Sequence, residues 1–319
     1  MKPEGTGRLG PPPINWAQID CTAKLDYIKV ASKKKRVLPV LSGTHNWNPI
    51  GRGYTGFTLT VQDPKLPDIK TLIDNMDDPM LMSFQLTIDL RPKATLTESD
   101  REPLLLETFR AVAGRFRPED AALWAYGVRG GTDGVGKTPK PFHRRFPEPN
   151  EELVYGQRGG WMQSTVYLKR TNEGDDLDYA EHCVRMELTL VRGGVMEIGL
   201  DRLSELCGFA YRPVFTKHFR IIAEPRIRAT RTRNAAELKK MTTKMQRAWA
   251  TAGVGKFGIT EAFRPDTLHT SFSRIAARER QQLPMRDHVL TRDQEATKNL
   301  GNALRQLQRR MTLKKSRSV

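Results

Sequence analysis

The chain has 319 residues, with 53 Lys and Arg against 36 Asp and Glu, a formal net charge of +17, and 38% hydrophobic residues. This composition suffices for one large or two medium domains, and no apolar run approaches the ~18 residues that a transmembrane helix requires. Residues 1–13 are rich in Gly and Pro, unlike a secretory signal. The cysteines are too widely spaced for a disulfide framework or paired metal ligands, so we expect a reducing, cytoplasmic setting.

Hydrophobic periodicity predicts strands and helices in the first half of the chain. Residues 1–24 are predicted to be a disordered lead-in, followed by a strand at 25–31, a turn-rich segment at 42–56 and a half-buried strand at 57–62. Helical spacing predicts one helix that carries Ile69, Leu72, Ile73 and Met76, and another over residues 101–116. Between them, a strand presents Met82, Phe84, Leu86 and Ile88 on one face and Ser83, Gln85, Thr87 and Asp89 on the other.

The second half of the chain is predicted to add two strands and several helices. The strands are at 164–170 and 184–191, and helices are expected at 199–207 and 235–250. Near the C-terminus, Thr291 and Gln294 form a capping-box pattern ahead of a helix striped by Leu300, Leu304, Leu307 and Met311. This order predicts an α+β fold, with a mostly antiparallel sheet and flanking helices over residues 25–215 and a basic helical C-terminal extension over residues 216–319.

Residues 131–138, GTDGVGKT, match the G-x-x-x-x-G-K-[ST] pattern of a phosphate-binding P-loop. That loop requires a helix that begins at the lysine, so that free N–H groups meet the phosphates. Four prolines follow within the next eleven residues and cannot support a long helix: Pro139, Pro141, Pro147 and Pro149. We therefore expect no nucleotide site at Lys137, and interpret the segment as a basic, glycine-rich loop that can lie along a DNA backbone.

The positive charge is concentrated in two C-terminal blocks. Residues 1–216 carry 29 basic and 28 acidic side chains, residues 217–256 carry 11 and 2, and residues 276–319 carry 11 and 4. Such a face repels itself unless a polyanion neutralises it, and DNA does so with release of counterions. We expect DNA binding, with a merely solvated surface and an anionic membrane surface as the alternatives. The residues predicted to bind DNA are Lys217, Arg220, Arg226, Arg228, Arg231, Arg233, Lys239, Lys240, Lys244 and Arg247.

Two acidic residues lie on predicted strands. Asp89 ends the strand SFQLTIDL, and Glu187 lies in CVRMELTL on the face opposite Met186 and Leu188. On neighbouring strands they can share Mg²⁺ or Mn²⁺, because carboxylate oxygens suit these cations. Such a metal polarises a phosphodiester for attack by a tyrosine hydroxyl; Tyr167, Tyr179 and Tyr211 are nearby in sequence. The alternative is that each acid is an ordinary polar residue on the solvent face of a sheet.

Four short segments resemble the replication initiation factors, the rolling-circle initiators of plasmids, integrative elements and some phages. FQLTIDLRPK at 84–93, STVYLKR at 164–170, LDYAEH at 177–182 and VRMELTL at 184–190 are similar to that family's R-x-D-x-x-x-D, T-x-Y-x-G-S, tyrosine and R-x-E-L-x-L segments. Gln85 stands in place of the first acid, and Lys169 and Arg170 in place of Gly-Ser. The resemblance covers residues 25–215.

This resemblance implies a relaxase-like endonuclease that nicks one strand at a replication origin. Asp89 and Glu187 would be its metal ligands. Tyr179 would be its nucleophile, with Tyr211 as an open competitor.

Residues 199–220 are similar to the second helix-turn-helix of AraC-type regulators, with Gly208 in the turn between two helices. An amphipathic helix followed by a turn explains the same pattern equally well.

Two functional hypotheses follow from the sequence. One is a replication initiator of a mobile element, which binds origin DNA through residues 217–256 and the C-terminal helix. The other is a non-catalytic DNA-binding regulator, in which the sheet serves only as a scaffold or dimer surface. The expected partner is origin DNA in double- and single-stranded form, and not a membrane. A homodimer and host replication proteins stay open as further partners.

Overall fold

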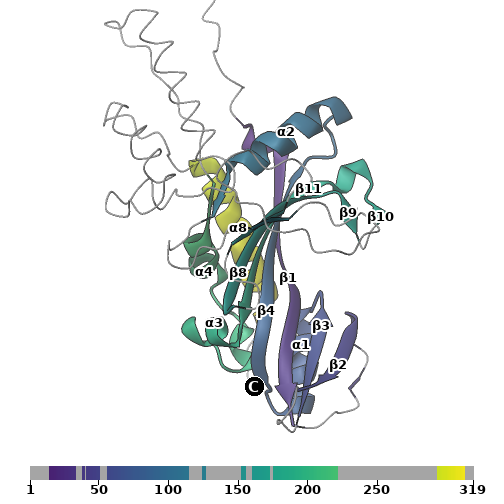
Figure 1. The fold of residues 1–319 in the computed structure, drawn as a ribbon, viewed down its shortest axis with the longest axis vertical. Helices are drawn as coiled ribbons and strands as arrows, with labels where there is room; N and C mark the ends of the chain where they lie inside the picture. Colours follow the sequence, from purple (N-terminus) through teal and green to yellow (C-terminus); the bar gives the residue numbers. More distant parts are fainter. Residues whose placement is uncertain are drawn as a thin grey trace, which may run out of the picture.

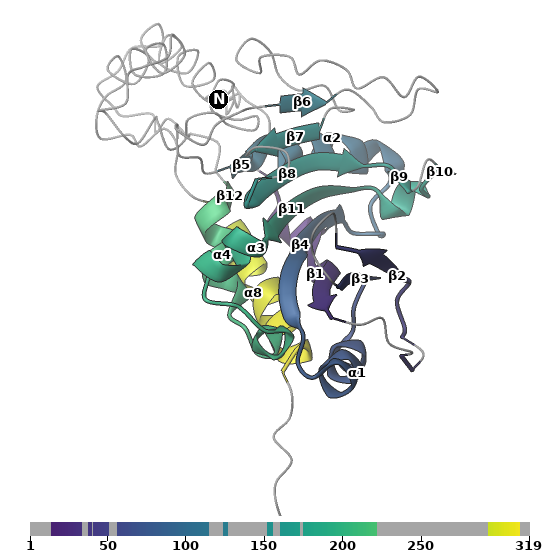
Figure 2. The same cartoon turned by 60° about the horizontal axis from the view of Figure 1, so that its bottom comes forward.

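An eight-stranded sheet forms the body of the computed structural model, which describes residues 14–33, 38–39, 41–50, 56–114, 124–126, 152–155, 160–172, 175–221 and 293–312. The strand order is β2-β3-β1-β4-β11-β8-β7-β6 (Figures 1 and 2), and every neighbouring pair is antiparallel. The bounds are β1 (Ile19–Ser32), β2 (His45–Pro49), β3 (Phe57–Gln62), β4 (Met80–Pro92), β6 (Trp124–Tyr126), β7 (Glu152–Tyr155), β8 (Met162–Lys169) and β11 (Cys183–Val191). Two short pairs, β9 (Thr171–Asn172) with β10 (Asp175–Asp176) and β5 (Val112–Gly114) with β12 (Phe219–Ile221), complete the strands.

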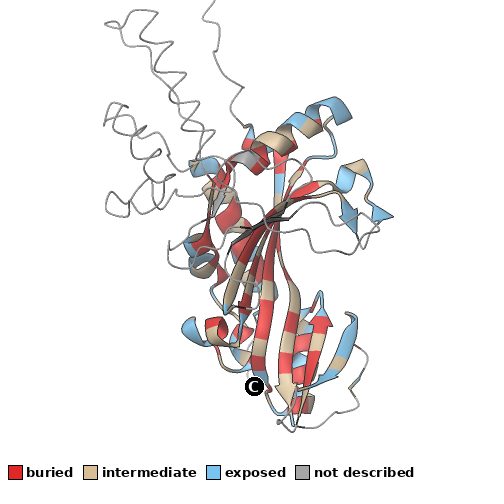
Figure 3. Cartoon of the chain, in the orientation of Figure 1, coloured by how far each residue is buried: buried red, intermediate tan, exposed pale blue. Residues whose placement is uncertain are grey.

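The central strand β4 has one apolar and one polar face, as its alternating sequence predicts. Leu86 pairs with Leu25 of β1 on one side and with Leu188 of β11 on the other, and all three are buried. On the opposite face, Thr87 lies between Lys24 of β1 and Glu187 of β11. Figure 3 shows buried residues running along these central strands. The sheet therefore presents a single polar face, built mainly by β4, β11 and β8.

Helices pack around the apolar side of the sheet, so the structure confirms an α+β fold with a mostly antiparallel sheet. The α-helices are α1 (Leu66–Met76), α2 (Glu98–Ala111), α3 (Arg192–Glu197), α4 (Tyr211–His218) and α8 (Gln294–Arg310), and the 3-10 helices are η1 (Trp16–Gln18), η4 (Tyr179–Glu181) and η5 (Leu203–Leu206). None of the helices in the described residues is long and apolar enough to cross a membrane.

The C-terminal helix α8 shares a hydrophobic core with the N-terminal strand β1 (Figure 2). Its predicted apolar stripe is confirmed, since Leu300, Leu304, Leu307 and Met311 are all buried. At its far end, Arg310 donates a hydrogen bond to the carbonyl oxygen of Ala23 in β1. The predicted boundary at residue 216 falls inside α4, which packs against α8. The described part of the C-terminal extension is therefore integral to the core of the sheet domain.

Several predicted element bounds differ from the structure. Strand β1 begins at Ile19, inside the predicted lead-in of residues 1–24, because Ile19 and Ala23 reach the core. The turn-rich segment 42–56 contains the edge strand β2. The helix predicted at 101–116 ends at Ala111, and the chain then pairs as β5 with β12. The N-cap of α8 is Asp293, whose carboxylate accepts from the backbone N–H of Ala296.

The helix predicted at 199–207 is wrong, and with it the first helix of the predicted helix-turn-helix. The chain turns at Gly199, where φ is +79°, and Arg202 then forms a β-bridge with Met80. Leu203 donates its backbone N–H to the carbonyl of Pro79 at 3.0 Å. These bonds to the start of β4 replace helical ones, and only the short 3-10 helix η5 forms. Tertiary pairing therefore overrides the local helical pattern.

Several sequence predictions fall outside the described residues. They include the P-loop-like segment 131–138 and the helix expected at 235–250. Eight of the ten residues predicted to bind DNA are also outside: Arg226, Arg228, Arg231, Arg233, Lys239, Lys240, Lys244 and Arg247.

Candidate functional site

The polar face of the sheet brings together the three strand segments that carry the family resemblance. Strand β11 lies between β4 and β8. Their register sets out two rows of paired residues across the face. In one row, Asp89 faces Arg185, which faces Tyr167; in the next, Thr87 faces Glu187, which faces Thr165. Asp89 and Glu187 are thus on adjacent strands and on one face, as expected, but in different rows.

Asp89 is bound by an arginine. The Nε and NH2 atoms of Arg185 each donate to one carboxylate oxygen of Asp89 at 2.7 Å, and both side chains are buried. This two-point geometry is the strongest that an arginine and a carboxylate form. Burial by itself lowers the pKa of Arg185, but hydrogen bonds to Asp89 and its charge raise that pKa above its usual value. The Arg185 guanidinium therefore stays charged and occupies both oxygens of Asp89.

Glu187 is held by two neutral donors. The hydroxyl of Tyr167 donates to Oε1 at 2.7 Å, and the amide of Gln85 donates to Oε2 at 3.1 Å. The same amide reaches Oγ1 of Thr189 at 3.0 Å. Burial, and next the negative charge of Glu187, raise the pKa of the Tyr167 phenol well above its ordinary value. Gln85, which replaces the acid of the family pattern, thus supplies a donor to Glu187 where a second carboxylate would repel it.

This donor set does not fit a divalent cation. Among the described residues, no three His, Cys, Asp or Glu side chains gather closely enough to hold a metal. Arg185 takes both oxygens of Asp89, and protein donors reach both oxygens of Glu187. A metal at Asp89 would be repelled by the guanidinium charge of Arg185, and a metal at Glu187 would compete with the Tyr167 and Gln85 donors.

None of the contacts of Tyr179 with the described residues is to Asp89 or Glu187. Its hydroxyl donates to the backbone carbonyl of Glu98 at 3.1 Å and reaches Oε2 of Glu102 at 3.4 Å, both in α2. Its ring lies 4.9 Å from that of His182 and under the guanidinium of Arg101. Burial and the nearby Glu102 and Glu98 raise the pKa of its phenol. The Tyr179 hydroxyl therefore meets α2, whereas Tyr167 is the tyrosine beside Glu187.

Tyr211, the competing tyrosine, is a core residue. Its side chain is fully buried in α4, and its hydroxyl donates to the carbonyl of Leu206 at 3.1 Å. Burial raises the pKa of this phenol. Without a local opening of the core, Tyr211 cannot meet a DNA phosphate.

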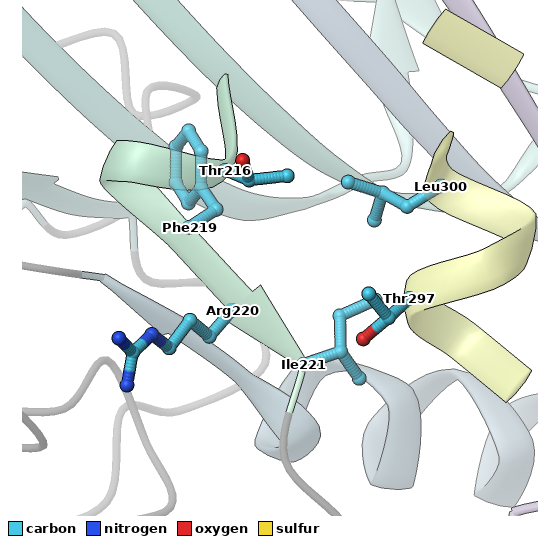
Figure 4. Close-up of a pocket in the computed structure, with 6 residues that line it drawn as sticks. All are labelled: Thr216, Phe219, Arg220, Ile221, Thr297 and Leu300. Carbon is cyan, nitrogen blue, oxygen red and sulfur yellow. The ribbon is translucent and has the colours of Figure 1, made fainter. Parts of the chain in front are cut away.

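Two of the predicted DNA-binding residues are described. Lys217 is exposed at the end of α4, with its Nζ 3.7 Å from Oε1 of Glu197. Arg220 lies on β12 beside a small, mainly apolar pocket (Figure 4). The pocket is lined by Thr216, Phe219, Arg220, Ile221, Thr297 and Leu300.

The C-terminal helix, which the sequence predicts to bind DNA, forms a basic ridge with α4 whose four cations, Arg212, Lys298, Arg305 and Arg309, the sequence does not single out. Lys298, Gly301, Arg305 and Arg309 follow one face of α8, and the three cations on it are exposed. Arg212 of α4 lies across Gly301, where an added Cβ atom would be 3.2 Å from its Nε. Glycine at 301 thus admits a fourth cation. The helical spacing of the α8 residues can be predicted from the sequence, but the position of Arg212 against Gly301 cannot.

Comparisons with known proteins do not assign the chain to a family. No protein-family model and no curated protein matches the chain. The solved structure of a rolling circle replication initiator protein from Geobacillus stearothermophilus is similar at 12% identity and a TM-score of 0.33, over 68% of this chain and 91% of that one. A likeness this weak assigns no function to the chain, whose function must be inferred from its own residues.

Proposed function

We propose that the chain is a replication-initiation protein of a plasmid or other mobile element and binds origin DNA. The observation that carries DNA binding is the basic ridge of Arg212, Lys298, Arg305 and Arg309. Within the described residues, no carboxylate pairs with any of these four cations. From Lys298 to Arg309 the ridge runs roughly 16 Å at 1.5 Å per residue. Unpaired cations in a line favour a phosphate backbone, whose binding releases counterions.

The polar face of the sheet supports a further proposal, that the protein nicks one DNA strand with Tyr167 as the nucleophile. Oε1 of Glu187 lies 2.7 Å from the Tyr167 hydroxyl and can accept its proton. The phenolic oxygen then bonds to phosphorus, one P–O bond of the strand breaks, and the departing oxygen takes up a proton. The products are a tyrosyl–DNA phosphodiester and a free hydroxyl end. Because the pKa of Tyr167 is raised, the reaction depends on a base such as Glu187.

Nicking is tested by incubating the protein with supercoiled plasmid that carries the origin, with Mg²⁺, with Mn²⁺ and with chelator. A covalent protein–DNA adduct is then sought on a denaturing gel. We expect the adduct to be lost in Tyr167→Phe and Glu187→Gln and kept in Tyr179→Phe. Loss in Tyr179→Phe alone would restore the nucleophile that the family resemblance implies. Dependence on Mg²⁺ or Mn²⁺ would show that residues outside those described complete a metal site.

The second candidate function is a non-catalytic DNA-binding regulator. The buried ion pair of Arg185 and Asp89 favours it, because a salt bridge that fills both carboxylate oxygens also suits a purely structural role. A parent protein that binds origin DNA but forms no adduct under any of the metal conditions would select this function over nicking. A replication assay with a plasmid that depends on the gene then tests initiation itself.

A further inference from the structure

Trp161 presents an exposed aromatic ring at the start of β8. Its side chain is 70% exposed, more than any other large hydrophobic residue of the described part. Val191, at the end of β11, is 37% exposed, and Met196, in α3, is 57% exposed. Tryptophan is enriched at binding sites because it offers a large, rigid contact area. We therefore expect a ligand to contact the exposed ring of Trp161.

Two glycines allow Trp161 to pack closely, Gly193 against its ring and Gly194 against its backbone. A Cβ atom at Gly193 would lie 2.6 to 2.8 Å from three adjacent ring atoms of Trp161, so the indole rests with one face on the Gly193 backbone. At Gly194, a Cβ atom would lie 2.3 Å from the carbonyl oxygen of Trp161. That oxygen accepts a hydrogen bond from the backbone N–H of Val191 at 2.9 Å.

Both glycines lie in the short helix α3. Glycine is the least favourable helical residue after proline. The close approach of Trp161, which leaves no room for a Cβ atom, explains why glycines occupy these two helical positions. One face of the indole is thereby pinned and the ring is held in advance of any ligand. Such preorganisation lowers the entropy that binding must overcome.

We propose that Trp161 is a stacking platform for an unpaired base of single-stranded DNA, a proposal that rests on the DNA-binding function above. A flat ring with one pinned face suits a planar ligand, and stacking on an aromatic side chain works with every base. The positive charge of the chain, which lies almost entirely C-terminal to residue 216, favours a polyanion as the partner of the protein.

The location of the platform fits the same ligand. Trp161 precedes β8, and Tyr167 lies on that strand six residues on, about 20 Å away at 3.3 Å per residue. A single strand stacked at Trp161 continues along β8 toward Tyr167 and Arg185. The platform thus lies at the start of β8, the strand that carries Tyr167.

The test measures binding of a fluorescent oligothymidylate, of an oligomer of equal length with abasic sites, and of a duplex. The proteins are the parent, Trp161→Ala, Trp161→Phe and the neighbouring control Met196→Ala. We expect Trp161→Ala to weaken oligothymidylate binding by about 5- to 150-fold, with a smaller loss in Trp161→Phe and none in Met196→Ala. The abasic oligomer and the duplex should bind parent and Trp161→Ala alike. Equal thermal unfolding midpoints exclude misfolding.

Other outcomes overturn the proposal in distinguishable ways. If the parent binds oligothymidylate and Trp161→Ala binds it equally well, or loses as much affinity for the abasic oligomer, there is no stacking platform. If Met196→Ala and Trp161→Ala both abolish self-association in light scattering and leave DNA binding intact, the surface that carries Trp161 and Met196 is a protein interface. If the parent binds neither single strand nor duplex, the proposed DNA-binding function itself fails.

Discussion

Arg185 binds both carboxylate oxygens of Asp89 across two neighbouring strands, through two hydrogen bonds of 2.7 Å between side chains that are 8% and 9% exposed. Asp89→Asn should leave the Arg185 charge buried and uncompensated, which costs about 3–5 kcal/mol. Urea unfolding measures this loss. The matched control is Asp63→Asn, which removes a partner of Lys24 in an ion pair with side chains 37% and 53% exposed, and should cost less than about 1 kcal/mol. Equal, small losses would mean that the buried pair contributes no more than a surface one.

The packing of α8 on β1 predicts that the C-terminal helix carries global stability. Leu304 is 1% exposed, so Leu304→Ala should lower the free energy of unfolding by about 2–5 kcal/mol through lost burial and a cavity. Gln306→Ala, an exposed position on the same helix, should leave it nearly unchanged. Chemical denaturation followed by circular dichroism makes the comparison. A loss confined to the helical signal, with the sheet unfolding as in the parent, would instead indicate that α8 unfolds independently of the sheet.

The basic ridge predicts a measurable salt dependence of DNA binding. If Lys298, Arg305 and Arg309 each contact a phosphate, each substitution by Ala should reduce the slope of log K against log salt by about 1. Lys70→Ala, which removes an exposed cation from α1, should leave the slope as in the parent. Fluorescence anisotropy with one duplex over a salt series provides the slopes. Unchanged slopes in all three ridge variants would assign DNA binding to other residues.

The buried thiol of Cys183 predicts a change of stability at alkaline pH. Burial, and next the charge of Asp89, raise the pKa of Cys183 from 9.0 to about 12. A raised pKa means that folding favours the protonated thiol. Its contribution is therefore complete below pH 9 and is lost as the pH rises from there toward 12.

Cys183→Ala should accordingly lose less stability than the parent between about pH 8 and pH 11. Unfolding in urea at several pH values gives both curves, and the difference between them isolates the thiol from the tyrosines and lysines that also titrate. Parallel curves would show that the thiol titrates alike in the folded and unfolded chains.

The sequence by itself determined the strands β1, β3, β4, β8 and β11, the faces of β4 and β11, and the apolar stripe of α8. The alternation from Met82 to Asp89 predicts which side chains share a face, because successive residues of a strand point to opposite sides. The stripe of α8 follows in the same way from 3.6 residues per turn. The sequence also put Asp89 and Glu187 on polar strand faces, where the structure has them. These features depend on local periodicity, which neighbouring residues suffice to specify.

Only the tertiary structure decided which residues meet. Strand order and register set Arg185 against Asp89 and Tyr167 beside Glu187, and nothing in either strand alone specifies its neighbour. The helix expected at 199–207 failed because Arg202 and Leu203 bond to the start of β4. Likewise, Arg310 reaches Ala23 across 287 residues of sequence. Such contacts arise when distant segments bury their apolar faces together, a global free-energy balance that local sequence patterns do not contain.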